Sequence, residues 1–158
     1  GIAPGDYVVM EFGGNDCNFN WKEIAEDNTK EHHPMTSVSE FKNIYSDMID
    51  EIRNCGGSPV LLSLPPICSQ RFFNCVSRGC NREKILEWLV GDVRIISDWH
   101  EQYNLEVFKL GLAKSVRVFD ITSTFFRKKN YPDYLCEDGM HPNQAGHRII
   151  AEAILEAI

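Results

Sequence analysis

The fold is decided by residues 6–16, DYVVMEFGGND, in which an apolar run leads directly into two glycines and an Asn-Asp pair. The run is rich in β-branched and aromatic side chains, which favour a strand that is buried on both faces. We therefore expect a strand over residues 6–14. The two glycines allow the chain to turn tightly where this strand ends.

Two more segments have the character of buried strands, residues 58–66 (SPVLLSLPP) and residues 115–121 (SVRVFDI). Between the strands, apolar residues recur at spacings of three and four, which predicts amphipathic helices. We expect helices from Ser39 to a left-handed cap at Gly56 and Gly57, over residues 82–90 and 92–114, and from an Asn143 cap through Ala157. Alternating strands and helices build an α/β fold, a parallel sheet covered by helices on both faces.

The rest of the chain is expected to form loops, over residues 15–38 with one helical turn near residues 21–25, and over residues 67–81. A length of 158 residues suits one domain, so residues 1–158 are expected to fold as a single domain. Ligand sites of parallel sheets lie at the carboxyl ends of the strands. The candidate site is therefore sought in the segments that follow the three strands.

Composition limits the classes of partner. The chain has 16 Lys and Arg against 23 Asp and Glu, a net charge of −7, which disfavours binding to nucleic acid or to anionic lipid. No apolar run is long enough to span a bilayer, so no membrane partner is expected. With 43% hydrophobic and 25% charged residues, the composition is that of a globular protein.

The six cysteines are scattered, without a C-x-x-C pair or a histidine at the spacing of a zinc finger. We therefore expect no metal site, and reduced thiols in or near the core. Reduced cysteines and the absence of a signal peptide point to a cytoplasmic location.

Residues 137–147, EDGMHPNQAGH, place Asp138 three residues before His141 in a loop ahead of the last helix. A turn of this length can bring the carboxylate to the ring Nδ1–H, which is the arrangement of a general base with its orienting acid. Pro142 favours an extended conformation for His141. The alternative is a surface turn with a capping acid.

Asn15 follows the first strand, where its side-chain amide could donate to an oxyanion, and Gly14 allows close approach of backbone N–H groups. The alternative for Asn15 is an ordinary Asn-Asp turn. The two stretches lie at the same predicted edge of the sheet, which favours a shared site.

These stretches resemble blocks of the SGNH hydrolases, also called GDSL-type lipases and acylhydrolases. VVMEFGGND, residues 8–16, is similar to the third block of the family, and EDGMHPNQAGH to the fifth. The resemblance implies a flavodoxin-like α/β/α fold with strand order 2-1-3-4-5, of which this chain would contain the third to fifth strands. It also implies an ester hydrolase that needs no cofactor, with Asn15 in the oxyanion hole, Asp138 as triad acid and His141 as triad base.

The first block of the family, a Gly-Asp-Ser turn carrying the nucleophile, and the second block have no counterpart here. We therefore expect the C-terminal portion of a longer enzyme, inactive by itself. The edge of the strand over residues 6–14 would then be bare, and we expect self-association through it.

Two side chains of this chain could replace the serine, Ser63 at the end of the second strand and Cys17 beside Asp16. The more economical interpretation places Asp16, Cys17, Trp21 and Ser63 in the lining of the pocket. The aromatic loop residues are expected either to wall the pocket or to pack beneath the loops: Phe19, Trp21, Phe72 and Phe73.

The substrate class implied by the resemblance is a small ester, whether a short acyl ester, an acylated sugar or a lipid. A second hypothesis is a non-catalytic binding module that kept the pocket and lost the nucleophile. A third is a flavodoxin-like domain for a phosphorylated ligand, which the lack of a Gly-rich phosphate loop disfavours.

Overall fold

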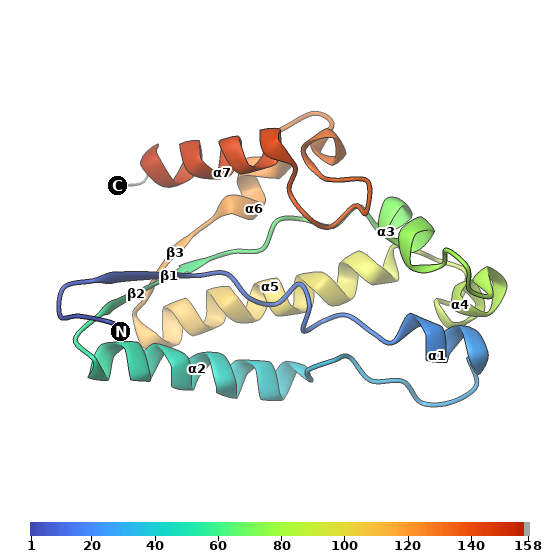
Figure 1. Ribbon diagram of the computed structural model, residues 1–158, viewed down its shortest axis with the longest axis horizontal. Coiled ribbons are helices and arrows are strands. Elements are labelled where there is room, and N and C mark those ends of the chain that lie inside the picture. The colour runs from blue at the N-terminus through green and yellow to red at the C-terminus, as the bar shows by residue number, and fades with distance from the viewer. Residues whose placement is uncertain (157–158) are drawn as a thin grey trace.

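A parallel sheet of three strands forms the centre of the computed structural model, which describes residues 1–156 (Figure 1). The strands are β1 (Tyr7–Met10), β2 (Ser58–Leu62) and β3 (Arg117–Phe119), in the order β1-β2-β3. Val9 pairs with Val60, and Leu61 pairs with Val118. The predicted α/β class with a parallel sheet is confirmed.

All three strands are shorter than predicted, and each has a local reason to end. β1 stops before Gly13, whose φ of +135° turns the chain away from the sheet. β2 stops ahead of Pro65 and Pro66, which cannot donate to a ladder. β3 begins only after Ser115, which ends the preceding helix in a left-handed conformation with a φ of +52°.

Helices cover both faces of the sheet (Figure 1). On one face lie α2 (Val38–Asn54) and α5 (Ile95–Lys114), and on the other lie α6 (Ile121–Phe126) and α7 (Gln144–Glu156). Successive residues of β2 point to opposite faces: Leu61 packs with α2 and α5, whereas Val60 and Leu62 pack toward α7. This two-sided burial explains the continuous apolar run of β2. The prediction that the first strand is also buried on both faces is wrong, because Met10 is the only fully buried residue of β1 and nothing in residues 1–156 covers Tyr7 and Val9.

The predicted caps of α2 and α7 are present. Gly56 has a φ of +83°, and the N–H of Gly57 donates to the carbonyl of Ile52, as in a left-handed helix end. The side-chain oxygen of Asn143 accepts from the backbone N–H groups of Ala145 and Gly146 at 2.9 and 3.0 Å. Ala157, the predicted last apolar residue of this helix, lies outside the described residues.

Two short helices occur near their predicted positions, α1 (Trp21–Glu26) and α4 (Arg82–Trp88). The prediction of a loop over residues 67–81 is wrong, because α3 (Ser69–Val76) occupies half of it. Its N-cap residue, Cys68, makes no side-chain cap hydrogen bond, so the sequence carries no start signal. Helix α3 is held by burial of Phe72 and Phe73. The short helix α6 and a 3-10 helix at Tyr131–Tyr134 were also unpredicted.

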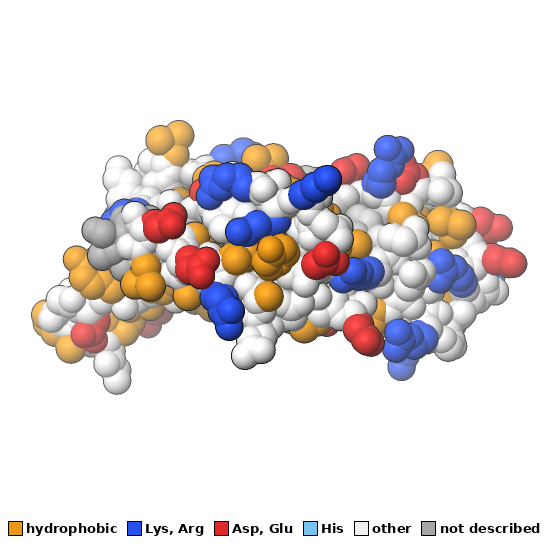
Figure 2. Space-filling model, turned by 90° about the horizontal axis from the view of Figure 1, so that it is seen from above, with side chains coloured by type: hydrophobic (Ala, Val, Ile, Leu, Met, Phe, Trp, Pro, Cys, Tyr) orange, Lys and Arg blue, Asp and Glu red, His pale blue; other side chains and the backbone are white. Residues whose placement is uncertain are grey.

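Within residues 1–156, β1 pairs with β2 alone, so its other edge is open. Tyr7 and Val9 on this strand are 78% and 54% exposed. The face of the molecule that Figure 2 shows is more polar than this edge, because Lys, Arg, Asp and Glu side chains are interspersed across it. In the part of the chain described, no helix combines the length and apolar character needed to cross a membrane.

Candidate active site

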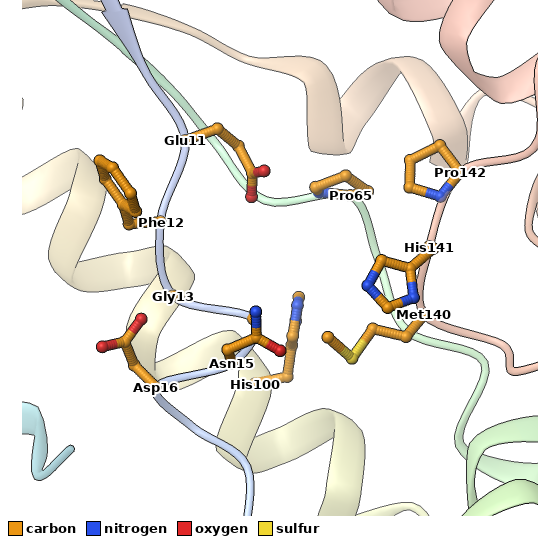
Figure 3. Close-up of a pocket in the computed structure, with 11 residues that line it drawn as sticks. Glu11, Phe12, Gly13, Asn15, Asp16, Pro65, His100, Met140, His141 and Pro142 are labelled. Atoms are coloured by element: carbon orange, nitrogen blue, oxygen red, sulfur yellow. The ribbon is translucent and has the colours of Figure 1, made fainter. Parts of the chain in front are cut away.

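A pocket of about 250 Å³ lies beyond the carboxyl ends of β1 and β2 (Figure 3). Four segments contribute: the loop after β1, Pro65 after β2, helix α5, and the turn before α7. Their lining residues are Glu11, Phe12, Gly13, Gly14, Asn15, Asp16, Pro65, His100, Met140, His141 and Pro142. This is the edge of the sheet at which parallel folds place their ligands.

The turn at residues 138–141 joins an acid to a histidine. The ring Nδ1–H of His141 donates to Oδ2 of Asp138 at 2.8 Å. The other carboxylate oxygen, Oδ1, accepts from the backbone N–H groups of Met140 at 2.9 Å and His141 at 3.0 Å. With Nδ1 engaged in this way, the His141 ring presents Nε2 to the pocket (Figure 3).

The surroundings of Asp138 favour its charged form. Partial burial acts to raise the pKa of this carboxyl, but the backbone N–H of Met140 and the ring and backbone of His141 outweigh it and hold the pKa below its usual value. A carboxylate that stays ionised can only accept hydrogen bonds, so it fixes the proton of His141 on Nδ1. Nε2 is thereby available to accept a proton.

Gly139 allows the turn to be this tight and ties it to α3. Its φ is +75°, and a Cβ atom built on it would lie 2.8 Å from the carbonyl oxygen of Cys68 and 2.9 Å from the nitrogen of Phe72. The N–H of Cys68 donates to the carbonyl of Gly139 at 2.7 Å. Any larger residue would therefore push the turn away from α3.

The loop after β1 closes on itself. The N–H of Cys17 donates to the carbonyl of Gly13 at 3.0 Å, and a Cβ on Gly13 would lie 2.8 Å from Leu64. Gly14 and Asn15 both line the pocket, and in Figure 3 the Asn15 amide stands across from His141. Within residues 1–156, no hydrogen bond engages the Asn15 side-chain amide, so its N–H groups are available to a ligand.

Glu11 was not singled out by the sequence. Its carboxylate points into the pocket from the end of β1 (Figure 3), where it is open to solvent at the mouth but otherwise surrounded by protein. This enclosure raises its pKa, while the charge of His141 acts in the opposite direction. The available signal was its position: Glu11 directly follows Met10, the last residue of β1.

His100 was also missed. It lies on α5, four residues after the buried Ile96 and three before the buried Tyr103, so helical spacing placed it on the inward face. Its side chain is 4% exposed and lines the pocket beside Asn15 and Met140 (Figure 3).

Of the other predicted site residues, Asp16 lines this pocket and Ser63, Cys17 and Trp21 do not. Ser63 is fully buried, and its Oγ accepts from the N–H and Oγ1–H of Thr122 at 3.0 and 2.9 Å, so the expectation that it faces the pocket is wrong. Ser63 directly follows Leu62, the last residue of β2, and lies against Thr122 at the start of α6. Asp16 does line the pocket, but its carboxylate is directed away from His141 (Figure 3).

Cys17 and Trp21 lie in the lining of a separate, much smaller cavity of about 10 Å³. The Cys17 thiol donates to the carbonyl of Gly14 at 3.2 Å, and burial, with the nearby Asp16 charge, raises its pKa to about 12. Such a thiol is a poor nucleophile near neutral pH. All six cysteines lie within residues 1–156 and are free thiols.

The loop aromatics form a packed cluster beside the pocket. Phe19, Trp21 and Phe72 lie in a hydrophobic cluster with α3, α4 and α5, together with the fully buried Phe73. Among residues 1–156, no group of three or more His, Cys, Asp or Glu side chains is placed to hold a metal ion.

Residues 1–149 match the model of the GDSL-like Lipase/Acylhydrolase family. Among curated proteins, it is 24% identical over 157 residues to the uncharacterized esterase YxiM of Bacillus subtilis (strain 168), covering 99% of this chain and 35% of that protein.

Solved structures show the same fold. A lipase/acylhydrolase from Enterococcus faecalis superposes with a TM-score of 0.64 at 20% identity, covering 97% of this chain and 60% of that one. A catalytic mutant of Axe2, an acetylxylan esterase from Geobacillus stearothermophilus, gives 0.64 at 21% identity, covering 96% and 58%. The chain thus spans about a third of the curated relative and less than two thirds of these structures. It belongs to the GDSL-like lipase/acylhydrolase family, with the fold of the SGNH hydrolases.

Proposed function

We propose that the complete protein hydrolyses esters through an acyl-enzyme, with His141 as the general base. The observation that carries this proposal is the Asp138–His141 pair, joined at 2.8 Å with the second ring nitrogen directed into a pocket. Membership of a family of lipases and acylhydrolases gives independent support.

In the proposed reaction, Nε2 of His141 takes the proton of an attacking serine hydroxyl as the hydroxyl oxygen adds to the ester carbonyl. The charge of Asp138 stabilises the imidazolium that results. Asn15, assisted by backbone N–H groups near Gly14, donates to the oxyanion. His141 then returns the proton to the leaving alcohol, and water releases the acid by the same sequence of steps.

We propose that the nucleophilic serine lies outside these 158 residues. The support is chemical: the described lining of the pocket contains neither a serine nor a threonine nor a cysteine, Ser63 is buried elsewhere, and Cys17 holds its proton tightly. The relatives are also much longer than this chain. On this proposal residues 1–158 alone are inactive.

For the substrate we propose a small ester, with a short acyl group on a sugar or another alcohol. A pocket of about 250 Å³ suits a short acyl group better than a long lipid chain. One solved structure with this fold is an acetylxylan esterase. Hydrolysis of 4-nitrophenyl esters of increasing acyl chain length will show the longest acyl group that the pocket accepts.

The proposal is tested by His141→Ala in the complete protein. We expect kcat/KM for 4-nitrophenyl acetate to fall at least about 10³-fold, because no other base is joined to a carboxylate in the pocket as described. The matched control is His147→Ala on the exposed side of α7, which should leave activity unchanged. Near-normal turnover in the His141 variant would refute the proposed mechanism.

We also propose that residues 1–158, expressed alone, self-associate through the open edge of β1. The exposed Tyr7 and Val9 side chains and the unpaired backbone of this edge support it. Size-exclusion chromatography should show a dimer or larger species, and Val9→Lys should shift it toward monomer. A wild-type segment that runs as a stable monomer would contradict this.

A further inference from the structure

His100 stands apart from the other buried polar residues. Each of the other five makes a side-chain hydrogen bond: Ser63, Ser77, Asn104, Thr122 and Thr124. Asn104, one turn along the same helix, accepts from the backbone of Leu64 at 2.9 Å. The His100 ring, which is 4% exposed, has no hydrogen-bond partner within residues 1–156.

The ring nitrogens of His100 must open into the pocket. No side-chain nitrogen or oxygen that is sealed from solvent lacks a partner in the described part of the chain. Since His100 is without one and lines the pocket, its nitrogens are reached from the pocket itself. In Figure 3 the ring rises from α5 between Asn15 and Met140 and points toward the interior of the pocket.

Water in the open pocket can reach the ring N–H of His100 in the free protein. A ligand group that displaces this water must accept the hydrogen bond itself, because otherwise the N–H is left unsatisfied in an enclosed site. Burial lowers the pKa of His100 to about 4, so the ring is neutral near pH 7 and offers one N–H donor and one acceptor. A neutral donor suits an uncharged oxygen atom.

The position of His100 separates it from the reacting groups. His141 is far more open, with 63% of its side chain exposed, and Asp138 already binds its Nδ1. His100 sits on a different element and is nearly covered, so it forms the floor of the pocket rather than its mouth. A substrate group that extends past Asn15 would meet this ring.

We infer that His100 is a substrate-binding residue that favours oxygenated esters, its ring N–H donating to a hydroxyl or ether oxygen beside the ester bond. The inference rests on the proposed ester hydrolysis at this pocket. An alkyl group at the same place would leave the N–H unpaired, so the residue would discriminate against it.

Two matched pairs of substrates test this in the complete protein. For an oxygen on the acyl side, 4-nitrophenyl methoxyacetate is compared with 4-nitrophenyl butyrate, which has a CH₂ in place of the ether oxygen. For an oxygen on the alcohol side, tetrahydropyran-4-yl acetate is compared with cyclohexyl acetate. Each kcat/KM is divided by the rate of alkaline hydrolysis, which removes differences in intrinsic reactivity.

We expect the wild type to prefer the oxygenated member of one pair by up to about tenfold, the value of one hydrogen bond. His100→Leu should abolish this preference, mainly through KM, and His100→Gln should keep part of it because its amide can donate. His147→Leu, on the exposed side of α7, is the control and should keep all of it.

Two outcomes would overturn the inference: no preference in either pair, or a preference that survives His100→Leu. In the second case, a loss of thermal stability in His100→Leu would assign the ring a purely structural role. Whether the protein hydrolyses esters at all is measured separately, with 4-nitrophenyl acetate as substrate for the wild type and for His141→Ala.

Discussion

The two walls of the pocket are built differently. On the wall before α7, Asp138 receives three hydrogen bonds from Met140 and His141, and Gly139 locks the turn against α3. On the facing wall, formed by the loop after β1 and by α5, the side chains of Asn15 and His100 are not engaged by other described residues. The wall before α7 is therefore preorganised without a ligand. The facing wall has hydrogen-bond donors that remain available to a ligand.

The largest loss of activity is expected from a substitution on the wall before α7. Asp138→Asn should reduce kcat about 10³- to 10⁴-fold, because an amide can donate to Nδ1 and so place the His141 proton on Nε2. KM should change little. Steady-state kinetics on 4-nitrophenyl acetate measure both constants in the complete protein, and a loss of less than tenfold would show that Asp138 does not set the tautomer.

A smaller loss is expected on the facing wall. Asn15→Ala should reduce kcat about 10²- to 10³-fold through loss of an oxyanion donor, with the fold intact because the Asn15 side chain supports no other described group. Asn15→Asp keeps the shape and should be at least as damaging, since a carboxylate cannot donate. Circular dichroism melting serves as the control for folding, and an unimpaired alanine variant would remove Asn15 from the mechanism.

The smallest effect concerns stability rather than turnover. Burial lowers the pKa of His100 from 6.5 to about 4, so the folded protein disfavours the protonated ring. In this pH window the unfolded chain binds more protons than the folded one, and stability falls as the pH drops from about 6.5 toward 4. At about pH 5 the cost should be about 2 kcal/mol.

His100→Gln should remove this part of the acid destabilisation. Urea unfolding at pH 7 and at pH 5 gives the difference directly, and comparing wild type with variant cancels the titration of Glu11, Asp16 and His141, which line the same pocket. Equal pH dependence in both proteins would mean that the His100 ring is protonated in the folded state without cost.

The sequence was most informative where local chemistry decides the structure. Residues with an unambiguous role reached their predicted positions: Asn143 caps α7, Gly56 ends α2 with a positive φ, and β2 is buried on both faces. The Asp138 and His141 side chains meet because a three-residue spacing with a glycine between them nearly forces the contact.

Where tertiary packing decides, the sequence was less informative. Helix α3 has no capping signal and exists because Phe72 and Phe73 find a buried surface that only the folded chain provides. Ser63 was expected in the pocket because it follows an apolar strand, but the direction of a side chain at a strand end depends on where the pleat stops. His100 was hidden in an apolar helical face, and its lack of a partner is visible only in three dimensions.

The hydrogen bond between Gly139 and Cys68, at the start of α3, bears on the order in which the chain folds. The two bonded residues, Cys68 and Gly139, are separated in sequence by α3, α4, α5, β3 and α6, so their contact closes a very long loop. We expect a contact of such high sequence separation to form late, because the loop that it closes costs the most entropy. His141, the proposed base, would therefore reach its position late in folding. A folding intermediate could then have a complete core while the pocket wall before α7 is not yet in place.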